Sequence, residues 1–175
     1  MNLKLSKAEL SELKKVLQPK VLDSVKNINI NILRNIYDRL NENVPVKLFV
    51  DGAADLHTKT AGIGGVFYRN SDELFSFSEF IGSATNNEAE YKALIKGLEE
   101  SHNLNILSIN IFADSELVVK QINGDYKVKN ERMQVLNKKV VNLLKNFSSW
   151  SIVHIPREKN SVADKLSKEG MRRKR

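Results

Sequence analysis

The chain of 175 residues has no cysteine, only three prolines, and no apolar run that approaches a length of about 18 residues. Without cysteine, a disulfide scaffold and a thiolate metal site are both excluded, and a reducing compartment is favoured. Without a long apolar run, a membrane-spanning helix is excluded. The first residues, Met1-Asn2-Leu3-Lys4, lead into a charged segment that lacks the apolar block and cleavage site of a signal peptide. These absences predict a cytoplasmic protein that does not contact a membrane.

Charge is distributed unevenly along the chain. The net charge of +7 combines opposed regions, because residues 47–125 hold 6 basic and 12 acidic residues while residues 126–175 hold 14 basic and 4 acidic ones. A basic end beside an acidic middle predicts a polyanionic partner and a reason to gather carboxylates. A basic surface that serves solubility alone is the competing interpretation.

Residues 1–45 are expected to form a helical appendage. Ser6-Lys7-Ala8-Glu9 has the pattern of a capping box, in which Ser6 accepts from the backbone and Glu9 reaches back. Apolar residues follow at helical spacing: Leu10, Leu13, Val16 and Leu17 before Pro19, then Val21, Val25, Ile28, Ile32, Ile36 and Leu40 after it. We therefore expect two amphipathic helices with apolar faces that need a partner.

From Val46 the pattern changes to that of an α/β domain, which we expect over residues 46–170, with a basic tail at 171–175. The predicted strands are residues 47–50, 61–69, 74–81, 106–113 and 150–155, and the predicted helices are residues 86–102, 114–122, 133–144 and 160–170. Gly62, Gly64 and Gly65 indicate close backbone approach at the second strand. The order β-β-β-α-β-α-α-β-α predicts a five-stranded mixed sheet flanked by helices.

Four acidic residues stand where the local pattern does not need an acid, although each has an ordinary explanation. Asp51 follows the apolar run Leu48-Phe49-Val50, and Asp-Gly also opens turns. Glu90 lies on the apolar stripe of its helix, and a capping box with Asn87 would also use it. Asp114 follows a strand, where it can be a plain N-cap. Asp164 can lie on a solvated helix face.

The predicted topology brings these four acids together. We expect Asp51 and Asp114 to end their strands at the same sheet edge, with Glu90 and Asp164 projecting from flanking helices. Four clustered carboxylates repel one another unless cations offset their charge. An all-oxygen donor set suits Mg²⁺ or Mn²⁺. Two such ions are the usual apparatus of in-line phosphodiester chemistry, so the pattern predicts a phosphodiester-cleaving site with two ions.

Over about residues 46–170, the chain resembles the catalytic domain of type 1 ribonuclease H. The resemblance is carried by Asp51-Gly52, Gly62-x-Gly64, Thr85-Asn86-Asn87-Glu88-Ala89-Glu90, Ala113-Asp114-Ser115 and Asn160-Ser161-Val162-Ala163-Asp164. Residues 116–121, 123–126 and 155–160 extend it and are similar to the reverse-transcriptase-like subgroup. The resemblance implies the ribonuclease H-like form of the predicted sheet.

The resemblance implies hydrolysis of the RNA strand of RNA–DNA hybrids, which leaves a 3′-hydroxyl and a 5′-phosphate. By position, Asp51 would bind both metal ions and Asp114 the ion on the side of the attacking water. Asp164 and Glu90 would bind the ion at the leaving group, and Glu90 would also contact the ribose 2′-hydroxyl, which distinguishes RNA from DNA. The substrate-binding residues implied are Gly52, His57, Thr85, Asn86, Asn87, Ser115, Glu116, Lys127 and Lys129.

The chain departs from the family pattern at several of these positions. His57 replaces an asparagine that usually contacts the RNA strand, and Glu116 stands where members often carry glutamine. Many members have a loop histidine before the last acid that assists proton transfer or product release, and here Arg157 is its expected substitute. Lys127 and Lys129 belong to a basic face that a solvated helix surface would equally explain.

Two other functions compete with the hybrid endoribonuclease. A catalytically weak module with a ribonuclease H fold would hold hybrids or duplex RNA, as the altered loop at His57 suggests. Another nuclease of the superfamily, such as a transposase or junction resolvase, is disfavoured by the Thr85-Asn86-Asn87 segment. The appendage has one aromatic residue, Tyr37, so base stacking is not its expected role. Protein partners are not identified by the sequence.

Overall fold

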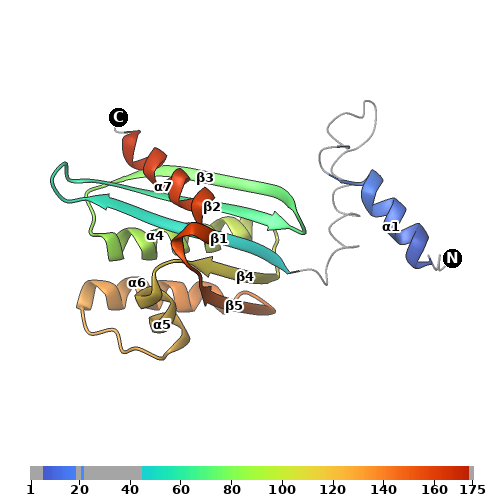
Figure 1. Ribbon diagram of the computed structural model, residues 1–175. Helices are drawn as coiled ribbons and strands as arrows, with labels where there is room; N and C mark the ends of the chain where they lie inside the picture. The colour runs from blue at the N-terminus through green and yellow to red at the C-terminus, as the bar shows by residue number, and fades with distance from the viewer. Residues whose placement is uncertain (1–5, 19–20, 22–44, 174–175) are drawn as a thin grey trace. The chain divides into compact units, whose positions relative to one another are not determined.

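The computed structural model describes residues 6–18, 21 and 45–173 (Figure 1). The chain divides between Val44 and Pro45 into two compact units. In the first, helix α1 (Lys7–Val16) begins at N-cap Ser6, whose capping box with Glu9 confirms the prediction. Apart from Val21, the predicted second helix lies outside the described residues, and the limits of the appendage stay a prediction.

The second unit contains a five-stranded sheet whose element order agrees with the predicted one. Its elements are β1 (Val46–Asp55), β2 (Thr60–Arg69), β3 (Asp72–Gly82), α4 (Asn86–Asn103), β4 (Ser108–Ala113), α5 (Glu116–Asn123), α6 (Glu131–Leu144), β5 (Ser149–His154), a 3₁₀ turn (Arg157–Lys159) and α7 (Ser161–Arg172). The strand order is β3-β2-β1-β4-β5. The pairs β1–β2 and β2–β3 are antiparallel, and β1–β4 and β4–β5 are parallel, so the sheet is mixed.

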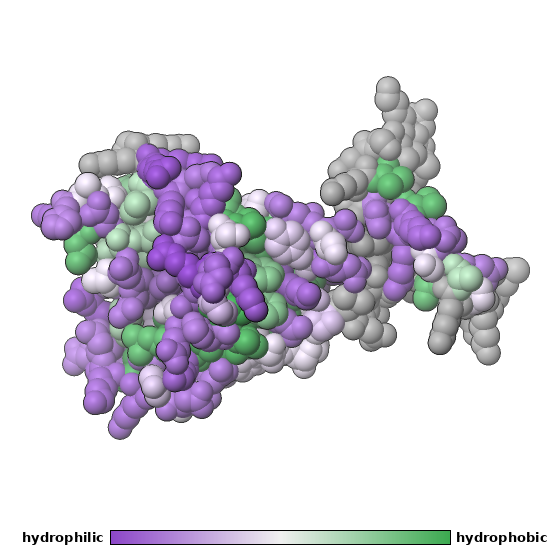
Figure 2. Space-filling view, in the orientation of Figure 1, coloured by the Kyte–Doolittle hydropathy of each residue, from purple (hydrophilic) through white to green (hydrophobic). Residues whose placement is uncertain are grey.

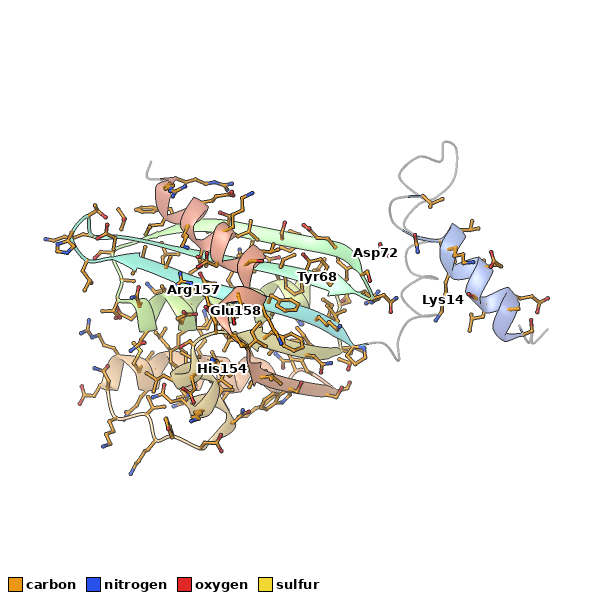
Figure 3. The ribbon with its side chains drawn as sticks, viewed as in Figure 1. Lys14, Tyr68, Asp72, His154, Arg157 and Glu158 are labelled. Carbon is orange, nitrogen blue, oxygen red and sulfur yellow. The ribbon has the colours of Figure 1, made fainter. Side chains whose placement is uncertain are left out.

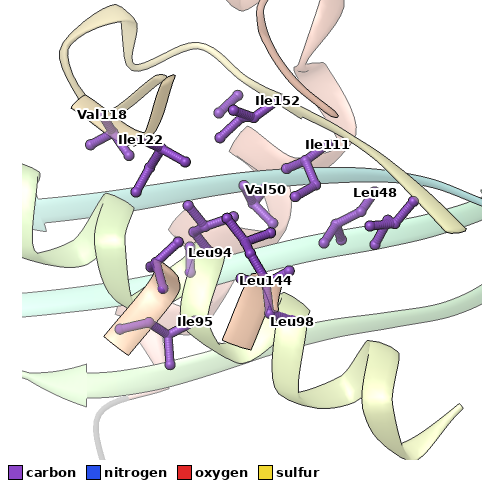
Figure 4. Packing of buried hydrophobic residues seen from close by; sticks show 14 of the residues in the cluster. Leu48, Val50, Leu94, Ile95, Leu98, Ile111, Val118, Ile122, Leu144 and Ile152 are labelled. Atoms are coloured by element: carbon purple, nitrogen blue, oxygen red, sulfur yellow. The ribbon is translucent and has the colours of Figure 1, made fainter. Parts of the chain in front are cut away.

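The main apolar core lies between the sheet and helices α4, α5 and α6. Leu48 and Val50 of β1 alternate with outward residues and pack with Leu94 and Leu98 of α4 and Ile111 of β4 (Figure 4). Helix α7 covers the opposite face, across β1, β2 and β3 (Figure 1). Within the described residues, no helix has the length and apolar character needed to cross a membrane.

Two glycines let helices approach the strand backbone on either side of Asp51. A Cβ atom at Gly52 would lie 2.2 Å from the carbonyl carbon of Ala89 in α4. A Cβ atom at Gly64, which pairs with Asp51 across the β1–β2 ladder, would lie 2.3 Å from the backbone nitrogen of Ser167 in α7. Asp51 is therefore held between two helices, and the predicted close approach at the second strand is confirmed.

Gly64→Ala is expected to destabilise the domain by about 2–3 kcal/mol, because the added methyl group meets helix backbone that cannot rotate away. Urea unfolding monitored by circular dichroism measures the change. Gly97→Ala is the matched control and should lower the midpoint less, since the nearest atoms to its methyl group would be side-chain carbons of Leu48 and Val50 and alanine favours a helix. Equal midpoints for Gly64→Ala and the wild type would contradict the expectation.

Candidate active site

Three carboxylates from separate elements converge at one edge of the parallel part of the sheet. Val50 pairs with Ala113, so the residues that follow, Asp51 and Asp114, lie side by side. Glu90 reaches them from α4, and its Oε2 accepts a hydrogen bond of 3.2 Å from the backbone nitrogen of Gly52. One oxygen from each of the three residues lies within 4.8 Å of the others. The three acids thus form an oxygen donor cluster.

The local alternatives for these acids do not describe the structure. The prediction that Asp51 ends a strand is wrong, because β1 continues to Asp55, where the hairpin still pairs with Thr60. The capping box at the start of α4 joins Thr85 to Glu88, which leaves Glu90 free to point inward. The N-cap of α5 is Ser115 rather than Asp114.

Burial and mutual repulsion raise the pKa values of two of the acids. Burial, followed by the negative charges of Asp51 and Asp114, raises the pKa of Glu90 to about 9. Burial also raises the pKa of Asp51 to about 6, against a hydrogen bond from Ser167 that acts in the opposite direction. With no cation bound, the ionised cluster is therefore unfavourable at neutral pH. A divalent cation removes this conflict, so the donor set fits a hard metal ion.

Asp164 lies beside this cluster, but its carboxylate is paired with two basic side chains. Its Oδ1 accepts a 2.9 Å hydrogen bond from Nε of Arg157, and its Oδ2 lies 2.6 Å from Nζ of Lys168. Burial acts to raise the pKa of Asp164, but the hydrogen bonds from Lys168 and Arg157 outweigh it and hold the pKa below its usual value. The structure thus brings three of the four predicted ligands together and pairs the fourth with basic side chains.

The cleft beside the acids has a volume of about 360 Å³ and mixed charge. Besides the three acids, Asn86, Arg157 and Lys168 line it. Arg157 lies near the start of α7 (Figure 3), and the face that carries this helix is largely hydrophilic (Figure 2). An acidic floor with basic side chains at its border can accommodate metal ions together with a phosphate group.

Two buried donors of the last segment were not predicted from sequence as site residues. Asn160 Nδ2 donates to Asp114 Oδ1 at 2.8 Å and to the carbonyl of Val50 at 2.9 Å. The hydroxyl of Ser167 donates to Asp51 Oδ2. Ser167 lies three residues after Asp164 on the same helix face, and this spacing is the signal that could have identified it.

The predicted substrate-binding residues are spread around the cleft. Gly52 and Asn86 line it, and Asn86 Oδ1 accepts a 3.0 Å hydrogen bond from the backbone nitrogen of Ala54. Thr85 and Asn87 line a neighbouring groove of about 230 Å³ that also contains Arg132.

The other predicted substrate-binding residues lie outside this cleft. Ser115 caps α5, and Glu116 is exposed and pairs with Lys120 at 2.7 Å. His57 is exposed in the β1–β2 turn, and Lys127 and Lys129 are exposed in the loop between α5 and α6. Their substrate contacts remain predictions, since geometry alone does not assign them.

This sheet order, with acids on β1 and α4, directly after β4 and on the last helix, defines a domain of the ribonuclease H fold class. The family model described as "Reverse transcriptase-like" matches residues 49–170. The chain belongs to this reverse transcriptase-like branch of the type 1 ribonuclease H family.

Relatives of known name agree with this membership. The chain is 34% identical over 127 residues to a ribonuclease HI of Halobacterium salinarum, covering 72% of this chain and 64% of that protein. It is 34% identical over 128 residues to a bifunctional protein of Mycobacterium tuberculosis, covering 72% of this chain and 35% of that protein. The chain therefore spans less than two thirds of the length of these curated relatives.

Solved structures share the fold. Ribonuclease H1 of Halobacterium salinarum superposes with a TM-score of 0.70 at 33% identity, covering 73% of this chain and 98% of that chain. A ribonuclease H1 isolated from compost, in complex with an RNA/DNA hybrid, gives a TM-score of 0.69 at 34% identity, covering 73% of this chain and 96% of that chain.

Proposed function

We propose that the chain is an endoribonuclease that hydrolyses the RNA strand of RNA–DNA hybrids and leaves 3′-hydroxyl and 5′-phosphate ends. The observation that carries this proposal is the cluster of Asp51, Glu90 and Asp114 within 4.8 Å. Its support is the 34% identity of the chain to a ribonuclease H1 whose structure is described as a complex with an RNA/DNA hybrid.

The proposed cofactors are two Mg²⁺ or Mn²⁺ ions held by Asp51, Glu90, Asp114 and Asp164. The all-oxygen donor set and the raised pKa values of Asp51 and Glu90 support hard divalent cations at this site. When bound, the ions would activate the attacking water and offset the charge on the leaving oxygen. Asp51 has the central position among the ligands, between the helix that carries Glu90 and the helix that carries Asp164.

Arg157 supplies a fixed positive charge at the border of the cleft. Its hydrogen bond to Asp164 raises the pKa of its guanidinium further above the usual value, so Arg157 does not exchange a proton during the reaction. Many family members use a histidine before the last acid. Arg157 instead attracts a phosphate oxygen of the RNA strand, and it pairs with Asp164 when no metal ion is bound there. It therefore replaces that histidine in electrostatics rather than in proton transfer.

Asn86 is the proposed contact with the bases or sugars nearest the cut. Because its Oδ1 is engaged by the backbone nitrogen of Ala54, its amide group presents N–H donors to the cleft. Glu90 lies on the same helix one turn later and can accept a hydrogen bond from a ribose 2′-hydroxyl. These two side chains together account for a preference for RNA at the cleaved position.

The proposal is tested by incubating the full chain with labelled RNA–DNA hybrid, duplex RNA and duplex DNA, each with Mg²⁺ or Mn²⁺. We expect cleavage of the hybrid RNA strand alone, with products that a polymerase extends from their 3′-hydroxyl ends. A hybrid left intact with both metals would overturn the enzymatic proposal. Salt-sensitive hybrid binding without turnover would instead support the binding module, and cleavage of duplex DNA would support another nuclease of the superfamily.

Replacing Lys127 and Lys129 with glutamine is expected to raise KM about fivefold and leave kcat unchanged. If both lysines neutralise phosphates, log–log plots of hybrid affinity against salt should become shallower by about 1 for each lysine. Fluorescence anisotropy from 50 to 200 mM salt measures the slope. Lys139→Gln is the control, because its charge is already paired with Glu99 at 2.8 Å. A double variant with the wild-type slope would show that this loop does not touch the substrate.

A further inference from the structure

Ser167 connects the last helix to the central acid of the cluster. Its side chain is completely buried, and its Oγ donates a hydrogen bond to Asp51 Oδ2 and lies 2.9 Å from the backbone carbonyl of Asp164. Asp51 is itself only 3% exposed. A buried hydroxyl thus meets a buried carboxylate from an element more than a hundred residues away in the chain.

We propose that Ser167 is a positioning residue that orients the Asp51 carboxylate for divalent cation binding. The proposal rests on the function proposed above, since it gives Asp51 the role of a metal ligand. The hydroxyl has one proton and can donate it to one acceptor at a time. When it donates to Asp51 Oδ2, it fixes the rotation of a carboxylate that has an oxygen within 4.8 Å of oxygens of Glu90 and Asp114.

The contact is built into the packing of α7. Ala163, Ser167 and Gly170 form the buried stripe of this helix. The stripe lies so close to the sheet that a Cβ atom at Gly64 would be 2.3 Å from the nitrogen of Ser167, and one at Gly170 would be 2.5 Å from the carbonyl oxygen of Glu79. Close packing requires only that the residues of this stripe be small. Ser167 is its polar member, and its hydroxyl lies at the position of Asp51.

A purely structural role for Ser167 is the competing explanation. A second buried serine, Ser101, has only such a role and serves for comparison. Ser101 of α4 is also completely buried, and its hydroxyl donates to the carbonyl of Gly97 at 2.8 Å. Such a bond only satisfies a helix carbonyl. Ser167 has the equivalent neighbour in the carbonyl of Asp164, but it has the Asp51 carboxylate in addition. The two serines therefore differ in the contact that the proposal concerns.

The experiment compares Mn²⁺ and Mg²⁺ binding to the wild type, Ser167→Ala and Ser101→Ala by isothermal titration calorimetry without substrate. Groups that orient metal ligands typically contribute about tenfold to a hundredfold in affinity. We expect a loss of that size for Ser167→Ala and wild-type affinity for Ser101→Ala. We also expect a matching rise in the metal concentration at half-maximal hybrid cleavage, with kcat at saturating metal changed much less.

Ser167→Cys replaces the hydroxyl with a somewhat larger thiol that is a weak donor, so it weakens the hydrogen bond without leaving a cavity. It should lose metal affinity as Ser167→Ala does, and circular dichroism should show native helix content. A folded Ser167 variant with wild-type metal affinity would overturn the proposal while leaving the proposed function intact. If the wild type bound metal but cut no hybrid, only the proposed function would be overturned. The metal affinities of the Ser167 variants would still decide the positioning role. A wild type that binds neither cation would overturn both.

Discussion

Asp51→Asn is expected to lower hybrid cleavage by about a thousandfold or more, equivalent to about 4 kcal/mol of transition-state stabilisation. The amide keeps the shape of the side chain but loses the charge that would hold two cations between Glu90 and Asp114. The metal-free variant should melt at or above the wild-type temperature at pH 8, because burial raises the pKa of Asp51 to about 6 and its ionisation there disfavours the folded state. Initial rates on labelled hybrid and thermal unfolding measure the two effects.

Asp55→Asn is the matched control for this variant. Asp55 ends the same strand, and its carboxylate accepts hydrogen bonds from the backbone nitrogens of His57 and Thr58 rather than facing the acid cluster. Its rate should stay within a few fold of the wild type. If Asp51→Asn retained a tenth of the wild-type rate, Asp51 would not be a central metal ligand.

Without divalent cations, the domain is expected to lose several kcal/mol of stability as the pH rises from about 4 to about 9. Glu90 has a folded-state pKa of about 9 against a usual 4.5, and Asp51 has about 6 against 3.8. The folded state therefore binds more protons than the unfolded state in this window. The stabilisation is complete below the usual pKa values and is lost as the pH rises through the raised ones. A pKa difference of one corresponds to about 1.4 kcal/mol, so these shifts are large.

Urea unfolding in chelator at pH 5, 7 and 9, repeated with Mg²⁺ or Mn²⁺, measures this dependence. Added cation should stabilise the domain most at high pH, where the ionised cluster needs it. Glu90→Gln should flatten the metal-free curve. Glu88→Gln should not, because the backbone nitrogen of Thr85 holds the pKa of Glu88 below its usual value and its stabilisation is lost only in acid. A metal-free wild type with equal stability at pH 5 and pH 9 would contradict the expectation.

Local sequence patterns predicted the elements of the domain well. The alternation of Leu48 and Val50 and the helical spacing of Leu94 and Leu98 depend on neighbours within a few residues, so they remain visible in the chain alone. The same applies to Glu90, whose place on the apolar stripe of α4 correctly indicated an inward side chain. The four acids were not identified by their local patterns, since each had an ordinary explanation; the predicted topology and the resemblance to type 1 ribonuclease H selected them together.

Other features required contacts between distant segments. The end of β1 was placed too early because the apolar run stops at Val50, whereas pairing with β2 continues to Asp55. The ion pair of Asp164 with Arg157 depends on how the 3₁₀ turn enters α7, whereas its pair with Lys168 is a local contact between residues one helical turn apart. The charges of the side chains alone do not indicate which basic residue will pair with a given acid.

The sequence by itself determined the order of the strands and helices, the identity of the acids and the elements that carry them. The elements follow from local periodicity, in which a residue's environment is set by its neighbours in the chain, and the choice of acids follows from the predicted order of those elements and from the family resemblance. Only the tertiary structure decided that three acids lie within 4.8 Å and that Ser167 contacts Asp51. These contacts depend on parallel strand register and on the approach of α7 at Gly64, and both are fixed by packing between segments far apart in the chain.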